Sequence, residues 1–307
     1  MYYIIFILAL LGLLLSANFF TKSAETIGKY FKLPTFVIGV FIVGIGTSLP
    51  ELISGIISVK NHASEILAGN IIGSNISNLL LITGLAVVVN RKNISLNSGY
   101  LYIDLHYLIG SFIFFYIIAY DGQIGIIESV FGLFMFIVYS FYLIKGETTI
   151  EKENEKSVNS FPIYSLIILI ISAIGIYFGA DYTVYSLDKI AIDLAIPKSI
   201  AALTLLSLGT TLPELAVNVS AIKQGKSEMA IGNILGSCIF NTLVIPFSAS
   251  LFGSITVTEN LIHFSLPVMA ASGLIFYLLA QDKKISIWEG LMFICLYALF
   301  IYKIVTN

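Results

Sequence analysis

Ten apolar stretches, each long enough to cross a lipid bilayer as a helix, dominate this 307-residue sequence. A spanning helix needs about 20 predominantly apolar residues. The stretches occupy residues 2–21, 35–59, 66–90, 99–120, 123–145, 161–182, 198–222, 229–253, 260–281 and 286–304. Only 11% of the residues are charged, whereas a soluble globular domain carries about 25%. The sequence therefore excludes a water-soluble enzyme and predicts an all-α, polytopic membrane protein.

The lysine and arginine residues predict how the chain lies in the membrane. Twelve of the 16 fall in segments that would face the cytoplasm if the N-terminus is outside, and four fall in the others. Because positively charged loops stay on the cytoplasmic side, we expect a multi-pass protein of the cell membrane with both termini outside. No basic region precedes the first stretch, which favours a retained helix over a cleaved signal peptide. The net charge of −2 provides no basic field for nucleic acid.

An internal repeat divides the chain into two halves. Residues 34–78 align with 197–241 without a gap at an offset of 163, and 17 of the 45 aligned positions are identical. Many of these identities are Gly, Pro, Ser, Thr, Asn or Glu, whereas chance similarity between apolar helices would match Leu and Ile. Five stretches precede a linker rich in Glu and Lys at 146–160, and five follow it. We therefore expect a cytoplasmic linker between two inverted five-helix repeats, at 1–145 and 161–307.

Inverted repeats place a substrate site near the bilayer midplane, where the two halves meet. The polar residues of this repeat lie at mid-stretch in the second, third, seventh and eighth apolar stretches. We expect these four helices to form the core around such a site.

The first repeated motif reads GIGTSLPE at 44–51 and SLGTTLPE at 207–214. Glycine loosens a helix and proline removes a backbone donor. We expect both spans to break at the helix-breaking residues Gly46, Pro50, Gly209 and Pro213. A break frees backbone carbonyl oxygens, which are tolerated at this depth only where protein or a water-filled cavity covers them. With hydroxyl and carboxylate oxygens nearby, they suit a hard cation such as Ca²⁺, which takes about six to eight oxygen ligands.

The same motif also fits a helix-capping box, as Ser48-x-x-Glu51 and as Thr211-x-x-Glu214. Capping alone does not account for two carboxylates at mid-membrane, since each costs about 2.5–3.5 kcal/mol or more when ionised there. Capping and ion binding are compatible roles, and we interpret Glu51 and Glu214 as ion ligands.

The second repeated motif reads GNIIGSNISN at 69–78 and GNILGSCIFN at 232–241. Its serine and its last asparagine are four residues apart, so in each half they share a helix face. We interpret these residues as ligands: Ser74, Asn78, Ser237 and Asn241.

Other residues of the second motif favour a packing role. Asn70, Asn75 and Asn233 are typical of side chains that hydrogen-bond between membrane helices. Gly69 and Gly73 are four residues apart, a pattern that predicts close approach of a neighbouring helix.

These motifs identify a family resemblance. GTSLPEL and GTTLPEL, each followed 18 residues after the glutamate by GN-x-x-GS, resemble the two α-repeats of the cation/calcium antiporter superfamily. Within it the chain is most similar to archaeal and bacterial sodium/calcium exchangers, whose five-plus-five helices match the ten stretches. The resemblance implies a secondary transporter rather than an enzyme. It would exchange Ca²⁺ for Na⁺ by alternating access, as a monomer in the lipid bilayer and without a cofactor.

The resemblance also implies four adjacent ion positions. A central calcium site would use Glu51, Glu214, Thr47 and Thr210. Beside the two glutamates, flanking sodium sites would use Ser48, Ser74 and the Gly44 carbonyl in one half, and Thr211, Ser237 and the Ser207 carbonyl in the other. Asn78 and Asn241 would line the remaining position.

Asn241 departs from the family pattern, because sodium exchangers usually carry aspartate there. The asparagine could mimic a protonated aspartate, lower the number of Na⁺ ions or change the coupling ion. A Ca²⁺/H⁺ antiporter or an exchanger of another cation is therefore the alternative, followed by a passive cation channel, whose flux would continue without a counter-ion. An intramembrane protease would leave the repeated Ser, Thr and Asn oxygens without a role.

Overall fold

The structure is a computed structural model that describes residues 2–91, 93–95, 101–145, 160–193 and 198–306. Within these ranges, nothing is described of the side chains at 95, 101, 187, 188 and 191–210. The elements up to residue 145 are α1 (Tyr2–Tyr30), α2 (Thr35–Ile38), η1 (Gly39–Gly44), α3 (Ile45–Thr47), α4 (Leu49–Lys60), α5 (Ser64–Ile76), η2 (Ser77–Ile82), α6 (Thr83–Asn90), β1 (Ile94–Ser95), α7 (Leu101–Ala119), β2 (Gln123–Ile124) and α8 (Ile126–Lys145). The elements after residue 160 are α9 (Ile163–Asp193), α10 (Lys198–Lys223), α11 (Ser227–Leu243), α12 (Ile245–Ser250), β3 (Ile255–Thr256), η4 (Leu261–Ser265), α13 (Leu266–Ala280), β4 (Lys284–Ile285) and α14 (Ile287–Thr306).

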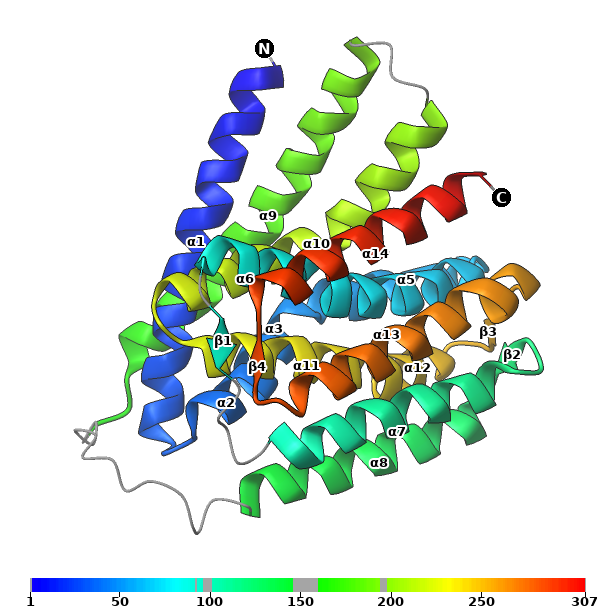
Figure 1. The fold of residues 1–307 in the computed structure, drawn as a ribbon, viewed down its shortest axis with the longest axis horizontal. Helices are drawn as coiled ribbons and strands as arrows, with labels where there is room; N and C mark the ends of the chain where they lie inside the picture. Colours follow the sequence, from blue (N-terminus) through cyan, green and yellow to red (C-terminus); the bar gives the residue numbers. More distant parts are fainter. Residues whose placement is uncertain (1, 92, 96–100, 146–159, 194–197, 307) are drawn as a thin grey trace.

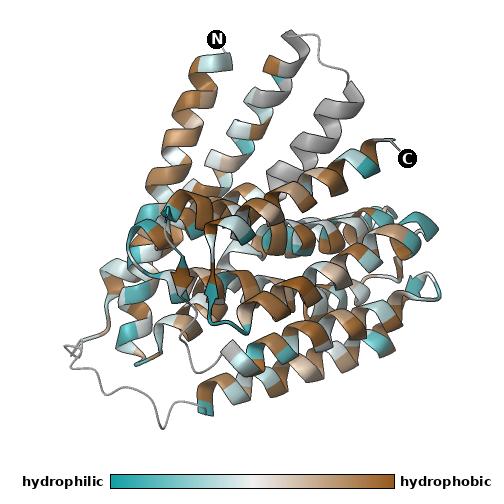
Figure 2. Cartoon of the chain, viewed as in Figure 1, coloured by the Kyte–Doolittle hydropathy of each residue, from teal (hydrophilic) through white to brown (hydrophobic). Residues whose placement is uncertain are grey.

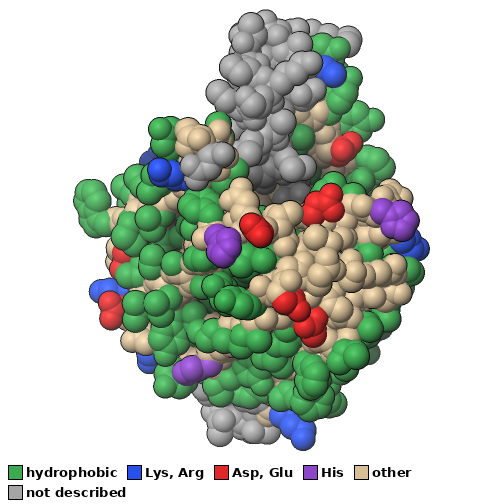
Figure 3. All heavy atoms as spheres, turned by 90° about the vertical axis from the view of Figure 1, so that its right-hand side faces the viewer, with side chains coloured by type: hydrophobic (Ala, Val, Ile, Leu, Met, Phe, Trp, Pro, Cys, Tyr) green, Lys and Arg blue, Asp and Glu red, His purple; other side chains and the backbone are tan. Residues whose placement is uncertain are grey.

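Each apolar stretch predicted from the sequence coincides with one helix or with consecutive helices (Figure 1). Within the described residues, nine of these segments are long and apolar enough to cross a membrane. The remaining predicted stretch, 198–222, coincides with α10. Hydrophilic residues gather at helix ends and turns (Figure 2), and on the face shown in Figure 3 charged side chains are few and scattered. Large apolar side chains are exposed on the outside of the helices, Ile127 at 75% for example, as expected of a surface in contact with lipid.

The second apolar stretch is interrupted at its centre, as the sequence predicts. Helix α3 ends at Thr47, Ser48 adopts φ −87° and ψ 2°, and α4 begins with Pro50 in its first turn. Two π-helices meet the repeated motifs: η1 ends at Gly44, where the first motif begins, and η2 begins at Ser77, at the end of the second motif and in the middle of the third stretch. The sequence analysis did not predict these wide turns, which are often found at functional sites.

The break predicted near Gly209 and Pro213 is wrong, because α10 runs as one helix with Pro213 inside it. Proline lacks the N–H that would bond to the carbonyl four residues earlier, but its fixed φ is compatible with a helix. One hydrogen bond can therefore be missing while the helical path continues. The two halves consequently differ at this point.

Helix α11 packs backbone to backbone against α2 and η1 through glycines. A Cβ atom on Gly232 would lie 2.3 Å from the Phe36 carbonyl oxygen, and one on Gly236 would lie 2.7 Å from the Val40 Cα atom. The close packing predicted for Gly69 and Gly73 is not found among the described residues: a Cβ atom on Gly69 would lie 4.0 Å from Leu261 Cδ1, and one on Gly73 would meet no described atom within 4 Å. Both of these glycines instead line a cavity of about 440 Å³ beside α5.

Two short antiparallel ribbons tie loops together. In the first, β1 pairs with β4 and Ile94 lies opposite Ile285. In the second, β2 pairs with β3 and Gln123 lies opposite Thr256. Each ribbon joins two loops that the predicted topology places on the same side of the membrane, so the pairings agree with the order of the predicted spans.

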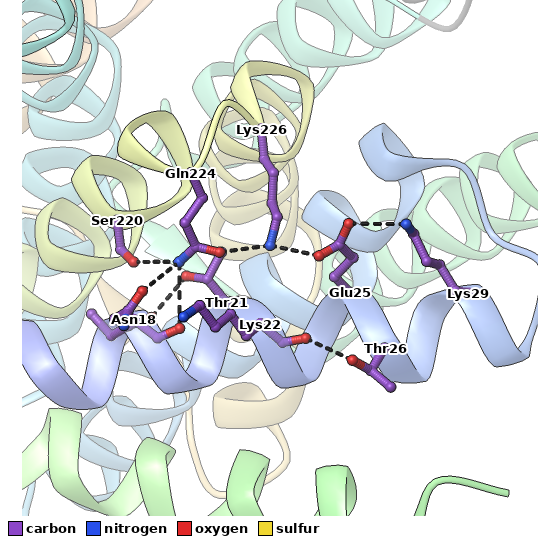
Figure 4. Close-up of polar contacts among 10 residues, drawn as sticks. Asn18, Thr21, Lys22, Glu25, Thr26, Lys29, Ser220, Gln224 and Lys226 are labelled. Carbon is purple, nitrogen blue, oxygen red and sulfur yellow. Dashed lines mark hydrogen bonds and ion pairs between the residues drawn. The ribbon is translucent and has the colours of Figure 1, made fainter. Parts of the chain in front are cut away.

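Helices α1 and α9 pack closely along each other at one side of the molecule (Figure 1). Two glycines of α9 allow this approach: a Cβ atom on Gly179 would lie 2.9 Å from Leu13, and one on Gly175 would lie 2.4 Å from Ser16 Oγ. Polar contacts join α1 to the loop between α10 and α11 (Figure 4). The Gln224 amide donates to Asn18 Oδ1 at 2.9 Å, and Lys226 Nζ lies 2.6 Å from a Glu25 carboxylate oxygen.

Candidate ion-binding site

Thr47, Ser48 and Glu51 lie at the interruption between α3 and α4. All three side chains are buried, with only 2% of Glu51 exposed. Ser48 occupies the cap position of α4, but its hydroxyl makes no capping hydrogen bond. The capping interpretation is thus supported by the position of Ser48 and not by its contacts, which leaves the hydroxyl oxygen for another role.

Glu214 comes from α10 and is also only 2% exposed. Its carboxyl group interacts electrostatically with that of Glu51, and the Thr47 hydroxyl lies within hydrogen-bonding reach of it. The structure therefore brings together two acidic residues that are 163 positions apart and occupy equivalent places in the repeat. Among the described residues, no basic side chain interacts with either carboxyl group.

Several oxygens of the predicted ligands have no hydrogen-bond partner among the described residues. They are Ser48 Oγ, Glu51 Oε2, Asn78 Oδ1, Glu214 Oε2 and Asn241 Oδ1. A buried polar group without a partner costs about 1–3 kcal/mol, and more when it is charged. A set of such oxygens around two carboxylates is chemically suited to a hard cation, which would supply the missing positive charge.

Direct hydrogen bonds connect the two halves at this point. The Ser237 hydroxyl donates to the Gly44 carbonyl at 3.2 Å, and the Thr47 hydroxyl lies 3.2 Å from Asn233 Oδ1. The packing role predicted for Asn233 agrees with this contact between α11 and α3. The Asn75 amide reaches the Met269 sulfur on α13 at 3.7 Å, whereas Asn70 accepts a hydrogen bond from Ser74 on its own helix, at 3.4 Å.

The second motif places Asn78 in η2 and Asn241 in α11, both buried. The Thr83 hydroxyl donates to the Asn78 backbone carbonyl at 3.1 Å. The Asn78 side chain lies within hydrogen-bonding reach of the Cys238 thiol, which also interacts electrostatically with Glu214. Cys238 therefore lies near both Asn78 and Glu214.

The remaining predicted ligands fall into three groups. Thr211 is buried on α10, one turn before Glu214. Ser74 is buried and lines the cavity beside α5. Ser207 and Thr210 belong to helix α10, but their side chains are not described.

Within the described part of the chain, no group of three or more His, Cys, Asp or Glu residues is arranged to hold a metal ion. The candidate site instead combines two carboxylates with hydroxyl, amide and backbone oxygens. Sequence reasoning did not identify Cys238 or Asn218 as neighbours of this site. Neither residue is identical to its repeat partner, Asn75 and Gly55 respectively, so the criterion of repeat identity could not find them.

The comparison with known proteins agrees with these features. The family model described as sodium/calcium exchanger protein matches residues 1–145 and 164–306. The sodium/calcium exchanger MaX1 of Methanosarcina acetivorans is 31% identical, over 97% of this chain and 97% of its own length. The membrane protein MJ0091 of Methanocaldococcus jannaschii is 34% identical, over 95% of this chain and 94% of its own. A solved structure of the sodium-calcium exchanger NCX_Mj superposes with a TM-score of 0.84 at 32% identity, covering 98% of each chain.

The chain belongs to the sodium/calcium exchanger family. It is a multi-pass membrane protein of a family of transporters, and its helical fold matches that of NCX_Mj.

Proposed function

We propose that this protein exchanges Ca²⁺ for Na⁺ across the cell membrane by alternating access. The observation that carries the proposal is the pair Glu51 and Glu214, which interact inside the protein without a basic partner among the described residues. Two carboxylates supply a charge of −2, which one Ca²⁺ neutralises. Calcium and several Na⁺ ions use the same oxygen ligands, so occupancy by one excludes the other, as exchange requires.

In this proposal the central calcium site consists of Glu51, Glu214, Thr47 and Thr210. Sodium ions use the two glutamates with the oxygens beside them: Gly44, Ser48, Ser74, Asn78, Ser207, Thr211, Ser237 and Asn241. The unpartnered oxygens of Ser48, Asn78 and Asn241 support this assignment. Exchange relatives that match nearly the whole chain support the choice of substrates.

The proposed architecture has ten transmembrane helices in two inverted repeats, at 1–145 and 161–307, joined by the cytoplasmic linker 146–160. The second, third, seventh and eighth helices form the core around the ions, and both termini are outside. The family model supports two halves, since its matched ranges separate near the linker. The ribbon pairings support the order of the spans. We propose that a single copy of the chain suffices for transport.

The test is ⁴⁵Ca²⁺ uptake by proteoliposomes loaded with Na⁺, with an outward sodium gradient and the proton gradient collapsed. Uptake should require internal Na⁺ and stop when external Na⁺ matches it. Uptake driven equally by a pH gradient with no sodium would identify a Ca²⁺/H⁺ antiporter instead. Flux that continues without any counter-ion would identify a channel, and a parallel arm with internal K⁺ tests whether K⁺ takes part.

A further inference from the structure

Asn218 is a buried polar residue next to the candidate site that none of the sequence motifs includes. It lies on α10 one turn after Glu214 and is fully buried. Its side-chain amide donates to the Glu214 backbone carbonyl at 2.8 Å. Its Oδ1 oxygen has no hydrogen-bond partner among the described residues.

The internal repeat gives this side chain a counterpart of different chemistry in the first half. The offset of 163 pairs Asn218 with Gly55 and Ala230 with Leu67. In the first half, a Cβ atom on Gly55 would lie 2.5 Å from Leu67 Cδ1, so leucine fills the space beside the glycine. The second half reverses the sizes, with asparagine on α10 and alanine on α11, two helices that contact each other. An amide thus takes the equivalent place of an apolar contact.

Gly55, the first-half counterpart of Asn218, borders a cavity. Gly55 and Leu67 line the cavity of about 440 Å³, which continues along Asn70 to Ser74, one of the proposed sodium ligands. Gly55 therefore lies between the candidate ion site and the end of α4 at Lys60. The repeat assigns Asn218 the equivalent position on α10, between Glu214 and Lys223.

The oxygen of Asn233 accepts a hydrogen bond from Thr47 and joins two helices. The amide group of Asn218 donates to the Glu214 carbonyl, and among the described residues its oxygen has no partner, as is also true of the Asn75 oxygen. A neutral amide oxygen is an accepted ligand for Ca²⁺ in proteins. A carbonyl oxygen one turn from an acidic ligand can hold a partly dehydrated cation that is entering or leaving.

We propose that Asn218 is a further cation-contacting residue, which binds Ca²⁺ and Na⁺ between the Glu51–Glu214 pair and the end of α10 at Lys223. The proposal rests on the proposed exchange function and adds a residue that the repeated motifs do not contain. It gives the two halves different chemistry at equivalent places, an amide in one and a glycine in the other.

The first test measures whether the residue faces an ion pathway, and it does not require transport. Asn218→Cys is made in a protein with Cys295→Ser, because Cys295 is exposed while Cys238 is buried and provides the labelling baseline. A small cationic thiol reagent should label the variant, and Ca²⁺ should slow labelling at least tenfold. The matched control is Val217→Cys, since Val217 is fully buried in the apolar cluster with α1 and α9 and should stay unlabelled. Labelling of Asn218→Cys that is absent, or unaffected by Ca²⁺, overturns the proposal.

The second test separates the oxygen of Asn218 from its amide donor. Asn218→Asp retains an oxygen, loses the donor and adds a negative charge, whereas Asn218→Leu loses both oxygen and donor. We expect the KM for Ca²⁺ applied from the side toward Lys223 to rise about tenfold in Asn218→Leu and to stay at or below that of the parent protein in Asn218→Asp, because a carboxylate oxygen also binds Ca²⁺. Equal losses in both variants would assign the effect to the hydrogen bond with Glu214 and overturn the proposal. Calcium-protected labelling without sodium-driven uptake would retain Asn218 as a cation contact and reject the exchange function.

Discussion

The hydroxyl of Ser237 donates a hydrogen bond to the backbone carbonyl of Gly44, at 3.2 Å, although the two residues are 193 positions apart. This contact joins α11 to the end of the π-helix η1, directly before the interruption that carries Glu51. The resemblance to the family implies separate sodium positions for these two residues. In this structure the two residues contact each other directly across the boundary between the two halves.

Ser237→Ala removes the donor of this contact and a proposed sodium ligand together. A typical hydrogen bond contributes about 0.5–1.5 kcal/mol, so we expect a modest loss of thermal stability in detergent. The larger effect should be on Na⁺, whose half-saturating concentration should rise more than that of Ca²⁺. The control is Ser248→Ala. The Ser248 hydroxyl donates a hydrogen bond to the Val244 carbonyl, one turn earlier, at 3.0 Å, and Ser248 lies outside the predicted site. An unchanged sodium titration in Ser237→Ala would exclude it as a sodium ligand.

The glycines of α11 and α5 provide a matched pair of substitutions. Gly236→Ala would place a Cβ atom 2.7 Å from Val40 Cα and should push α11 away from η1. Overpacking of this kind costs about 1–3 kcal/mol, and transport should fall because the site lies between these elements. Gly73→Ala, at the equivalent position, would meet no atom of the described residues within 4 Å and should leave thermal stability unchanged or slightly raised. Equal stability losses in the two variants, measured by thermal unfolding in detergent, would contradict this packing.

Asn241→Asp would add a third carboxylate to the candidate site. Two carboxylates balance two Na⁺ ions, whereas three Na⁺ ions leave one positive charge unbalanced. The added charge should steepen the dependence of uptake on Na⁺ and change the net charge moved in each cycle, which responds to membrane voltage by about 2.3 kcal/mol per charge per 100 mV. Sodium titrations at two set voltages measure both effects. A sodium dependence identical to that of the parent protein would remove Asn241 from the coupling site.

The polar contacts between α1 and the α10–α11 loop predict a small, salt-sensitive contribution to stability. Lys226 Nζ lies 2.6 Å from one Glu25 oxygen, and Lys29 Nζ lies 3.2 Å from the other. Partly exposed ion pairs contribute about 0.2–1 kcal/mol, so Glu25→Gln should lower the unfolding temperature slightly at low salt. The difference should shrink at high salt, because ions screen the charges. A large loss that is independent of salt would indicate a different role for Glu25.

The sequence predicts much of this architecture because its strongest signals are local. Ten apolar stretches and the pairs of Gly and Pro residues locate the helices and the interruption at Ser48. The same reasoning predicted a break at Pro213 that is absent, since a proline can remain within a helix when neighbouring contacts hold the helical path. It also missed η1 and η2, because the wide turns of a π-helix have no simple sequence pattern.

The candidate site was predictable to the extent that the repeat preserves residues. Glu51 and Glu214 were selected because they are identical and acidic, and the structure brings their carboxyl groups together. Asn218 and Cys238 lie beside them at positions where the two halves differ, so repeat identity could not identify them. The close contact at Gly236 and the open space at Gly73 likewise depend on tertiary packing, which differs between halves that share the same motif.

The central claim is that Glu51 and Glu214 together hold the transported ions, and it is tested most directly by ⁴⁵Ca²⁺ uptake into sodium-loaded proteoliposomes. Glu51→Gln and Glu214→Gln should each reduce uptake by about 100-fold or more, because each leaves a buried charge unbalanced in the presence of Ca²⁺. The control is Glu128→Gln, since Glu128 accepts a backbone hydrogen bond from Gly125 in a turn away from the site and should leave uptake near the parent rate. Full uptake in either variant of the pair would contradict the assignment of the ion site.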